Sequence, residues 1–188
     1  MDFHDVAPGL RYWLAPHPEW RPGNDWPEEV LCVEYEAPEA LVLIDPLVPG
    51  GGEDEFWEHA QRLGAPVRVL LTAPWHRRDA ALFTGALLEG DPPAGIETFV
   101  ADGVQEGQRA FFIREHRTLV VAEYFMGAAD GLRVCPSPAE TDPDRFIHSL
   151  HRLLELPVER VLTAHGPPVL ADGAGAIRKA LDAAERGR

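Results

Sequence analysis

The chain has 188 residues, 45% hydrophobic and 26% charged, with a formal net charge of -14 at pH 7. This length and composition suit a single globular domain, residues 1–188, with a sizeable core, and the excess of negative charge argues against nucleic-acid binding. No apolar run approaches the length of a membrane span, and the acidic start lacks a signal-peptide pattern. Cys32 and Cys135 form no CxxC pair. We therefore expect buried thiols, a cytoplasmic protein and no membrane partner.

Apolar periodicity and turn residues predict strands and helices in alternation. The expected strands span residues 10–14, 29–36, 40–44, 66–71, 96–100, 109–114, 118–121, 132–135 and 161–163. The expected helices span residues 53–63, 79–88, 144–156 and 174–184. This order suits two sheets covered by helices.

The strand expected at 66–71 runs into a loop that contains His76 and Asp79. Loops at the carboxyl ends of strands usually carry the chemistry of α/β proteins. The two residues are three apart, so they face one cleft if the loop begins a helix. Asp79 equally suits the N-cap of that helix, where its carboxylate would accept backbone N–H groups.

Three further candidates stand at the ends of apolar strands. Asp45 can orient a neighbouring ligand, or it can simply form the turn before a proline. Glu123 is either a ligand or the point where its strand leaves the core, because a buried carboxylate needs a partner. His165 precedes a glycine, which lets the backbone turn sharply; it is either a ligand or a structural histidine.

In chain order, these landmarks resemble the metallo-β-lactamase fold superfamily, which includes glyoxalase II-like hydrolases. Residues 41–45 look like the strand and Asp that precede the metal site, and 69–72 like the strand that runs into T-H-x-H-x-D-H. Residues 118–123 are similar to the strand that leads to a metal-bridging Asp, and 146–166 to the closing helix, strand and His-Gly. The resemblance covers nearly the whole chain and implies an α/β fold, a four-layer αββα sandwich.

The chain departs from the family pattern at the metal site. Counted from Thr72 without a gap, the family's His, His, Asp and His positions fall on Ala73, Trp75, Arg77 and Arg78. A slip of one residue brings His76 onto the second His position. The family's G-H-T-x-G loop is not found, and the bridging Asp becomes Glu123.

The resemblance implies a mononuclear metal-dependent hydrolase with a degenerate site. We expect one zinc ion, since zinc takes N and O ligands and keeps a position for water in catalytic sites. The groups that could hold it are His76, Asp79, Glu123 and His165. His76 and Asp79 are the expected catalytic residues, with Asp45 behind them. A bound zinc lowers the pKa of its water toward about 7.

Arg77 and Arg78 would then bind an anionic group of a small-molecule substrate. The alternative is a metal-free pseudoenzyme, because two arginines repel a divalent cation and favour an anion. Its cleft would bind an anionic ligand or a protein partner. Phe111 and Phe112 break the alternation of their strand and suggest an apolar surface for a homodimer.

Overall fold

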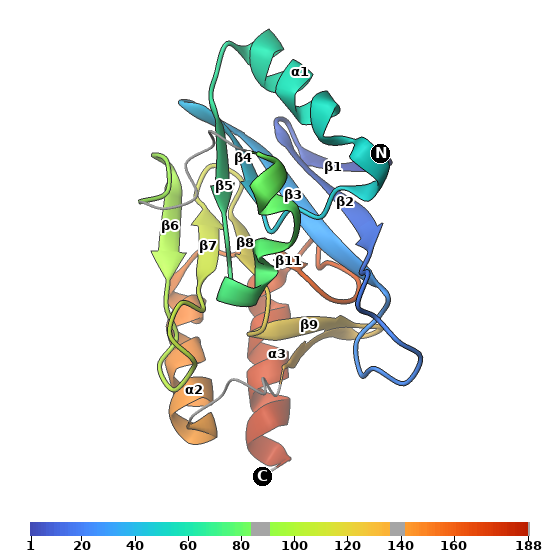
Figure 1. Ribbon diagram of the computed structural model, residues 1–188. Helices are drawn as coiled ribbons and strands as arrows, with labels where there is room; N and C mark the ends of the chain where they lie inside the picture. Colours follow the sequence, from blue (N-terminus) through green and yellow to red (C-terminus); the bar gives the residue numbers. More distant parts are fainter. Residues whose placement is uncertain (84–90, 136–141, 188) are drawn as a thin grey trace. The chain divides into compact units, whose positions relative to one another are not determined.

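The computed structural model describes residues 1–83, 91–135 and 142–187. The chain divides into two compact units, Met1–Ile96 and Glu97–Arg188. Each unit has a β-sheet with α-helix packed on it (Figure 1), so the predicted α/β class is confirmed. Whether the chain acts as one domain stays a prediction. None of the described helices is long and apolar enough to cross a membrane.

The sheet of the first unit has five strands in chain order. They are β1 (Phe3–Ala7), β2 (Leu10–Pro16), β3 (Glu29–Ala37), β4 (Ala40–Ile44) and β5 (Val67–Leu70). The first four pair antiparallel, whereas β5 joins β4 in parallel. A parallel partner requires a crossover, which is supplied by the short 3-10 helix η1 (Pro49–Gly51) and by α1 (Glu53–Leu63).

Sequence signals explain both ends of α1 and its packing. Three acidic residues occupy the first turn, where they favour the helix dipole. Gly64 ends the helix with φ 67°, and its N–H bonds to the last carbonyls. Between these ends, Phe56 and Ala60 are buried against Trp13 and other apolar side chains of the sheet. This packing fixes the position of the helix on its sheet.

The second unit has a four-stranded sheet in the order β11-β8-β7-β6 and a separate hairpin. The sheet strands are β6 (Ile96–Phe99), β7 (Ala110–Ile113), β8 (Thr118–Val121) and β11 (Arg160–Thr163). The hairpin pairs β9 (Phe125–Ala128) with β10 (Gly131–Val134). The helical elements are α2 (Pro143–Leu150), the 3-10 helix η3 (His151–Glu155) and α3 (Gly173–Arg186).

The helices of the second unit bury their apolar faces in one core with the strands. Figure 1 shows α2 and α3 beside each other. Asp142 caps α2 by accepting the N–H of Arg145, and Pro143 occupies the first turn. Asp172 caps α3 in the same way through the N–H of Gly175. The caps set where each helix begins, and the core sets which face it buries.

Several elements differ from the sequence prediction. β1 and β9 were not expected, because their short segments carry polar or glycine residues that break the apolar pattern. The helix expected at 79–88 is wrong within the described residues. A 3-10 helix, η2 (Pro74–Leu82), stands there and begins at a proline, which suits a first turn. The N-cap is Ala73, so Asp79 does not have the capping role. Residues 84–88 of the expected helix lie outside the described residues.

Phe111 and Phe112 do not form the apolar surface expected for a homodimer. Both side chains are buried, and Phe112 belongs to the core of the second unit. The strand alternation breaks here because β7 is buried at all four positions. The homodimer therefore stays a prediction, and Phe111 and Phe112 no longer support it.

A buried ion cluster joins the first sheet to α1. The Glu34 side chain is only 1% exposed and accepts from Arg11 Nε at 2.7 Å. His59 Nδ1 lies 3.0 Å from the same carboxylate. The guanidinium of Arg11 also lies over the ring of Phe3, 3.6 Å from its centroid. Glu34 is therefore a buried charge that depends on its partners.

The substitution Arg11→Met tests this dependence. It removes the main partner of Glu34, so the free energy of unfolding should fall by about 3 kcal/mol in urea denaturation. Arg62→Met, on the exposed side of α1, is the matched control and should change stability by less than about 0.5 kcal/mol. Equal effects of the two variants would contradict the cluster's role.

Candidate functional site

The parallel pairing of β4 with β5 brings Asp45 and Thr72 together. Ile44 pairs with Leu70, so the residues that follow both strands emerge at the same edge of the sheet. The Asp45 carboxylate accepts from the Thr72 N–H at 2.8 Å and also from the Thr72 hydroxyl. Asp45 has φ 51°, a left-handed conformation that Asp tolerates better than most residues. The carboxylate thereby links the segment that follows β4 to the segment that follows β5.

His76 is the third member of this cluster. The 3-10 helix η2 places its ring Nδ1 3.0 Å from Asp45 Oδ2 and 3.1 Å from Thr72 Oγ1, and the residue is 3% exposed. A carboxylate beside Nδ1 favours a proton on that nitrogen, so the neutral form of the ring has its lone pair on Nε2. This is the arrangement of an oriented histidine ligand. The role of Asp45 behind a metal ligand stays a prediction.

The charge of Asp45 is held by its neighbours. Burial alone raises the pKa of this carboxyl, but the charges of His76 and Arg78 and the hydrogen bonds of His76 and Thr72 outweigh it. As a result, the pKa of Asp45 lies below the ordinary value of an aspartic acid. Asp45 therefore stays ionised inside the protein.

Three other predicted residues lie on η2, each with different surroundings. Arg77 is exposed. Arg78 points inward, where its Nη1 donates to the backbone oxygen of Asp45 at 3.3 Å. Asp79 accepts the N–H of Val48 at 2.7 Å, which ties η2 to the segment after β4. Arg78 and Asp79 thus hold the loop in place, and of these three residues only Arg77 is exposed.

The second unit repeats the arrangement with another parallel pair. Val121 at the end of β8 pairs with Thr163 at the end of β11. Glu123 and His165 each stand two residues beyond these ends, so they emerge side by side. His165 Nε2 lies 3.8 Å from Glu123 Oε1, and the two side chains are 10% and 13% exposed. The sequence order alone had suggested both as ligands, and the structure brings them together.

Two glycines fix the His165 loop against the β9–β10 hairpin. Gly127 of β9 donates its N–H to the His165 oxygen at 2.8 Å. A Cβ added at Gly127 would overlap the backbone of Pro167, and a Cβ added at Gly166 would overlap the carbonyl of Gly127. Gly166 also has φ 78°. The backbones approach so closely that no side chain fits between them.

Sequence reasoning did not find Thr72 or Gly127 as functional neighbours. In the sequence, Thr72 marked only the end of a strand. Once the pairing of β4 with β5 is known, its hydroxyl is recognisable as a hydrogen-bond donor to the buried Asp45 carboxylate. Nothing in the sequence marks Gly127, because its role depends on a loop that lies almost forty residues away in the chain.

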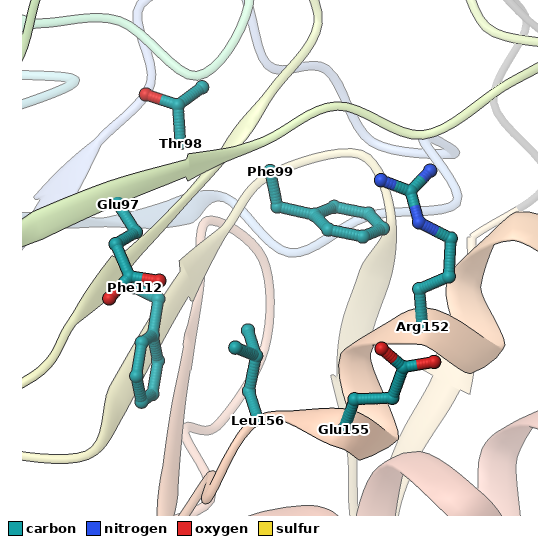
Figure 2. A pocket seen from close by; sticks show the side chains of 7 residues that line it. All are labelled: Glu97, Thr98, Phe99, Phe112, Arg152, Glu155 and Leu156. Carbon is teal, nitrogen blue, oxygen red and sulfur yellow. The ribbon is translucent and has the colours of Figure 1, made fainter.

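A pocket of about 200 Å³ in the second unit lies outside this constellation. Phe99, Phe112 and Leu156 form its apolar part, and Arg152 lies over the Phe99 ring, 5.0 Å from its centroid (Figure 2). Neither Glu123 nor His165 lines it. We therefore do not assign it to the candidate site.

Replacing the charge of Asp45 should destabilise the first unit in a pH-dependent way. Asp45→Asn removes one acceptor for Thr72 and His76, so the free energy of unfolding at pH 7 should fall by about 2–3 kcal/mol. Since the folded pKa is lowered, the carboxylate's contribution is present above the unfolded value of about 3.9 and is lost as the pH falls through the folded pKa. Urea denaturation of both proteins from pH 7 to pH 3 measures this. A difference that stays constant or grows on acidification contradicts the assignment.

The close approach at Gly127 predicts a strong effect of a single methyl group. Gly127→Ala must displace the His165 loop and should lower the free energy of unfolding by about 2–3 kcal/mol. The matched control is Gly187→Ala, where φ is -81° and the nearest atom to an added Cβ is 3.5 Å away. Chemical denaturation compares the two, and the NMR signals of the His165 ring should shift only in the first variant. Unchanged His165 signals in Gly127→Ala would contradict the contact.

Comparison with known proteins identifies the fold. No protein-family model matches the chain, and no curated protein matches it. A metallo-beta-lactamase family protein from Thermus thermophilus aligns with TM-score 0.66 and 17% identity, covering 97% of this chain and 81% of that one. A metallo beta lactamase from Erythrobacter litoralis gives 0.69 and 15%, covering 98% and 92%.

A third solved structure, the DIM-1 metallo-beta-lactamase, aligns with TM-score 0.71 and 11% identity over 100% of this chain and 98% of that one. Identities this low establish the fold and not the activity. The chain has the metallo-β-lactamase fold, and the fold predicted from its sequence is confirmed.

Proposed function

We propose that this protein is a metal-dependent hydrolase with one zinc ion held by His76, Glu123 and His165. The observation that carries the proposal is the placement of these residues. Each stands in a loop at the carboxyl end of a parallel strand pair, where α/β proteins bind ligands. Two imidazoles and one carboxylate are a common donor set of catalytic zinc sites, which keep a fourth position open.

The fit of zinc to these residues also rests on their present geometry. Asp45 already orients the His76 ring through Nδ1, as the outer carboxylate of a histidine ligand does. Glu123 and His165 are 3.8 Å apart, close to the roughly 3.4 Å between N and O ligands of a tetrahedral zinc. A solved structure of the Erythrobacter litoralis enzyme with TM-score 0.65 is described as its mono-zinc form. That structure supports the single ion per chain that we propose.

When bound, zinc supplies a Lewis acid and lowers the pKa of water toward about 7. The residues of this chain would orient the site and bind the substrate. The exposed guanidinium of Arg77, next to His76 in the chain, would take an anionic group of a small-molecule substrate. We leave Asp79 outside the ligand set, because its carboxylate already accepts the Val48 N–H.

Arg78 supports a second candidate function, a metal-free protein that binds an anion. Its Nε is buried and has no hydrogen-bond partner within the described residues. Within the described residues, no carboxylate oxygen lies within 4.0 Å of the Arg78 guanidinium, although its charge lowers the pKa of Asp45. A guanidinium group whose Nε is buried and unused as a donor suits an anionic ligand. In this reading His76 and His165 would contribute N–H donors instead of metal ligands.

The proposal also includes the cellular location of the protein and the class of its partner. We place it in the cytoplasm, a location supported by the absence of a disulfide between Cys32 and Cys135 in the described structure. The net charge of -14 supports a small-molecule partner over a nucleic acid.

Metal content separates the two candidate functions. The untagged full-length protein, purified without chelators and then given zinc, should retain about one zinc per chain after desalting, as measured by elemental analysis. His76→Ala, Glu123→Gln and His165→Ala should each lower that content, because a zinc site with two remaining protein ligands is weak. His148→Ala, an exposed residue of α2, is the matched control and should retain the ion. No bound zinc in the parent protein would overturn the hydrolase proposal and favour the anion-binding one.

A further inference from the structure

The pocket of the second unit lies between one edge of its sheet and the 3-10 helix η3. Its apolar floor is formed by Phe99 of β6, Phe112 of β7 and Leu156, the residue that follows η3 (Figure 2). In the described sheet, β6 is an edge strand and β7 is its neighbour. Phe99 and Phe112 also belong to the buried core of this unit. The core therefore holds the floor in place as a preformed surface for an apolar group.

Two side chains of opposite charge extend from η3 at the rim of this pocket. Arg152 and Glu155 are three residues apart, and residues at this spacing lie above one another on a 3-10 helix. Both line the pocket, and both are exposed. The guanidinium of Arg152 lies over the Phe99 ring, 5.0 Å from its centroid (Figure 2). The ring thus positions a charge at the rim and leaves its hydrogen-bond donors unused.

The charges of Arg152 and Glu155 are available to a ligand. Within residues 1–83, 91–135 and 142–187, neither side chain forms a hydrogen bond or an ion pair, and the two do not pair with each other. Glu97, another charged residue of the lining, differs because its carboxylate forms an ion pair with Arg114. Among the described residues, the lining therefore offers one cation and one anion without a charged partner.

This charge pattern favours a ligand that carries both charges. A ligand with only a carboxylate would be attracted by Arg152 and repelled by Glu155, and a ligand with only an amine would meet the reverse. A zwitterion presents an opposite charge to each side chain. Its carboxylate can also accept two parallel hydrogen bonds from a guanidinium. The apolar floor adds room for a hydrophobic group on the same ligand.

The volume of the pocket limits the size of this ligand. Pockets for drug-sized molecules measure about 300–1,000 Å³, whereas this one measures about 200 Å³. One water molecule occupies about 30 Å³ of the liquid, so the pocket has room for about seven. A single amino acid is of this size, whereas a longer peptide would leave most of its residues outside.

We propose that this pocket binds a free α-amino acid with an apolar side chain. The carboxylate of the ligand accepts hydrogen bonds from Arg152, its ammonium group donates to Glu155, and its side chain packs on the apolar floor. The site lies entirely within the second unit and shares no residue with the candidate metal site. This inference therefore does not depend on the proposed function, and either can fail without the other.

NMR titration of the full-length protein with L-leucine tests the proposal, because it detects the weak binding expected of a small pocket. L-leucine should produce saturable shifts in the signals of the Arg152 guanidinium and the Phe99 ring. N-acetyl-L-leucine lacks the ammonium charge, L-leucinamide lacks the carboxylate, and glycine lacks the apolar side chain. Each analogue should bind at least about tenfold more weakly, since a charged hydrogen bond or the burial of an apolar side chain contributes at least this factor.

Substitutions on η3 identify the residues that bind the ligand. Arg152→Gln and Glu155→Gln should each weaken the binding of L-leucine at least about tenfold, because each removes one charged partner. Arg178→Gln changes an exposed arginine of α3 outside the pocket. It is the matched control and should bind L-leucine as the parent protein does. Circular dichroism checks that all three variants are folded.

Four results would overturn the proposal. The first is a parent protein that shows no saturable binding of L-leucine. The second is equal binding of N-acetyl-L-leucine, which resembles the end of a peptide chain and would show that an anion is sufficient. Equal binding of L-leucinamide, the third, would show that a cation is sufficient. The fourth is parent affinity in folded Arg152→Gln or Glu155→Gln, or an equal loss in Arg178→Gln, which would place L-leucine at another site.

Discussion

Hydrogen bonding between parallel strands constrains where this chain can place reactive groups. Parallel partners end at the same edge of a sheet, so the residues that follow them emerge together. The first unit uses this geometry between β4 and β5, and the second uses it between β8 and β11. Asp45 and His76 gather at one pair of ends, and Glu123 and His165 gather at the other. Other residues of each unit then hold each of these two pairs in position.

In the first unit, the loop after β5 is organised around the buried charge of Asp45. A buried carboxylate is costly unless it is paired and hydrogen-bonded. Thr72, His76 and Arg78 meet that requirement together, which explains why a polar loop can lie against an apolar sheet end. The inward turn of Arg78 therefore has a structural cause, and only Arg77 carries the positive charge of this pair outward.

The sequence could predict the strands and the positions of the candidate ligands, since both follow from local patterns. β4, β8 and α1 occupy the residues expected from their apolar periodicity. The partners of each residue could not be predicted in the same way. Cys135 meets Glu123 through a hairpin register, and Gly127 meets the His165 loop through a backbone contact. Neither contact joins residues at a regular distance along the chain, so hydrophobic periodicity could not predict it. η2 was mispredicted for a related reason, because its shape follows from Pro74 and the tie of Asp79 to Val48.

The contact between Gly127 and Gly166 determines which positions near His165 tolerate a substitution. A ligand such as Glu123 or His165 can be exchanged in a single substitution, since each candidate ligand is a side chain at the end of an intact strand. A side chain at either glycine position meets backbone atoms of the other segment, so a substitution there must displace the loop and lowers stability. The fold therefore constrains the path of this loop more tightly than it constrains the side chains that the loop carries.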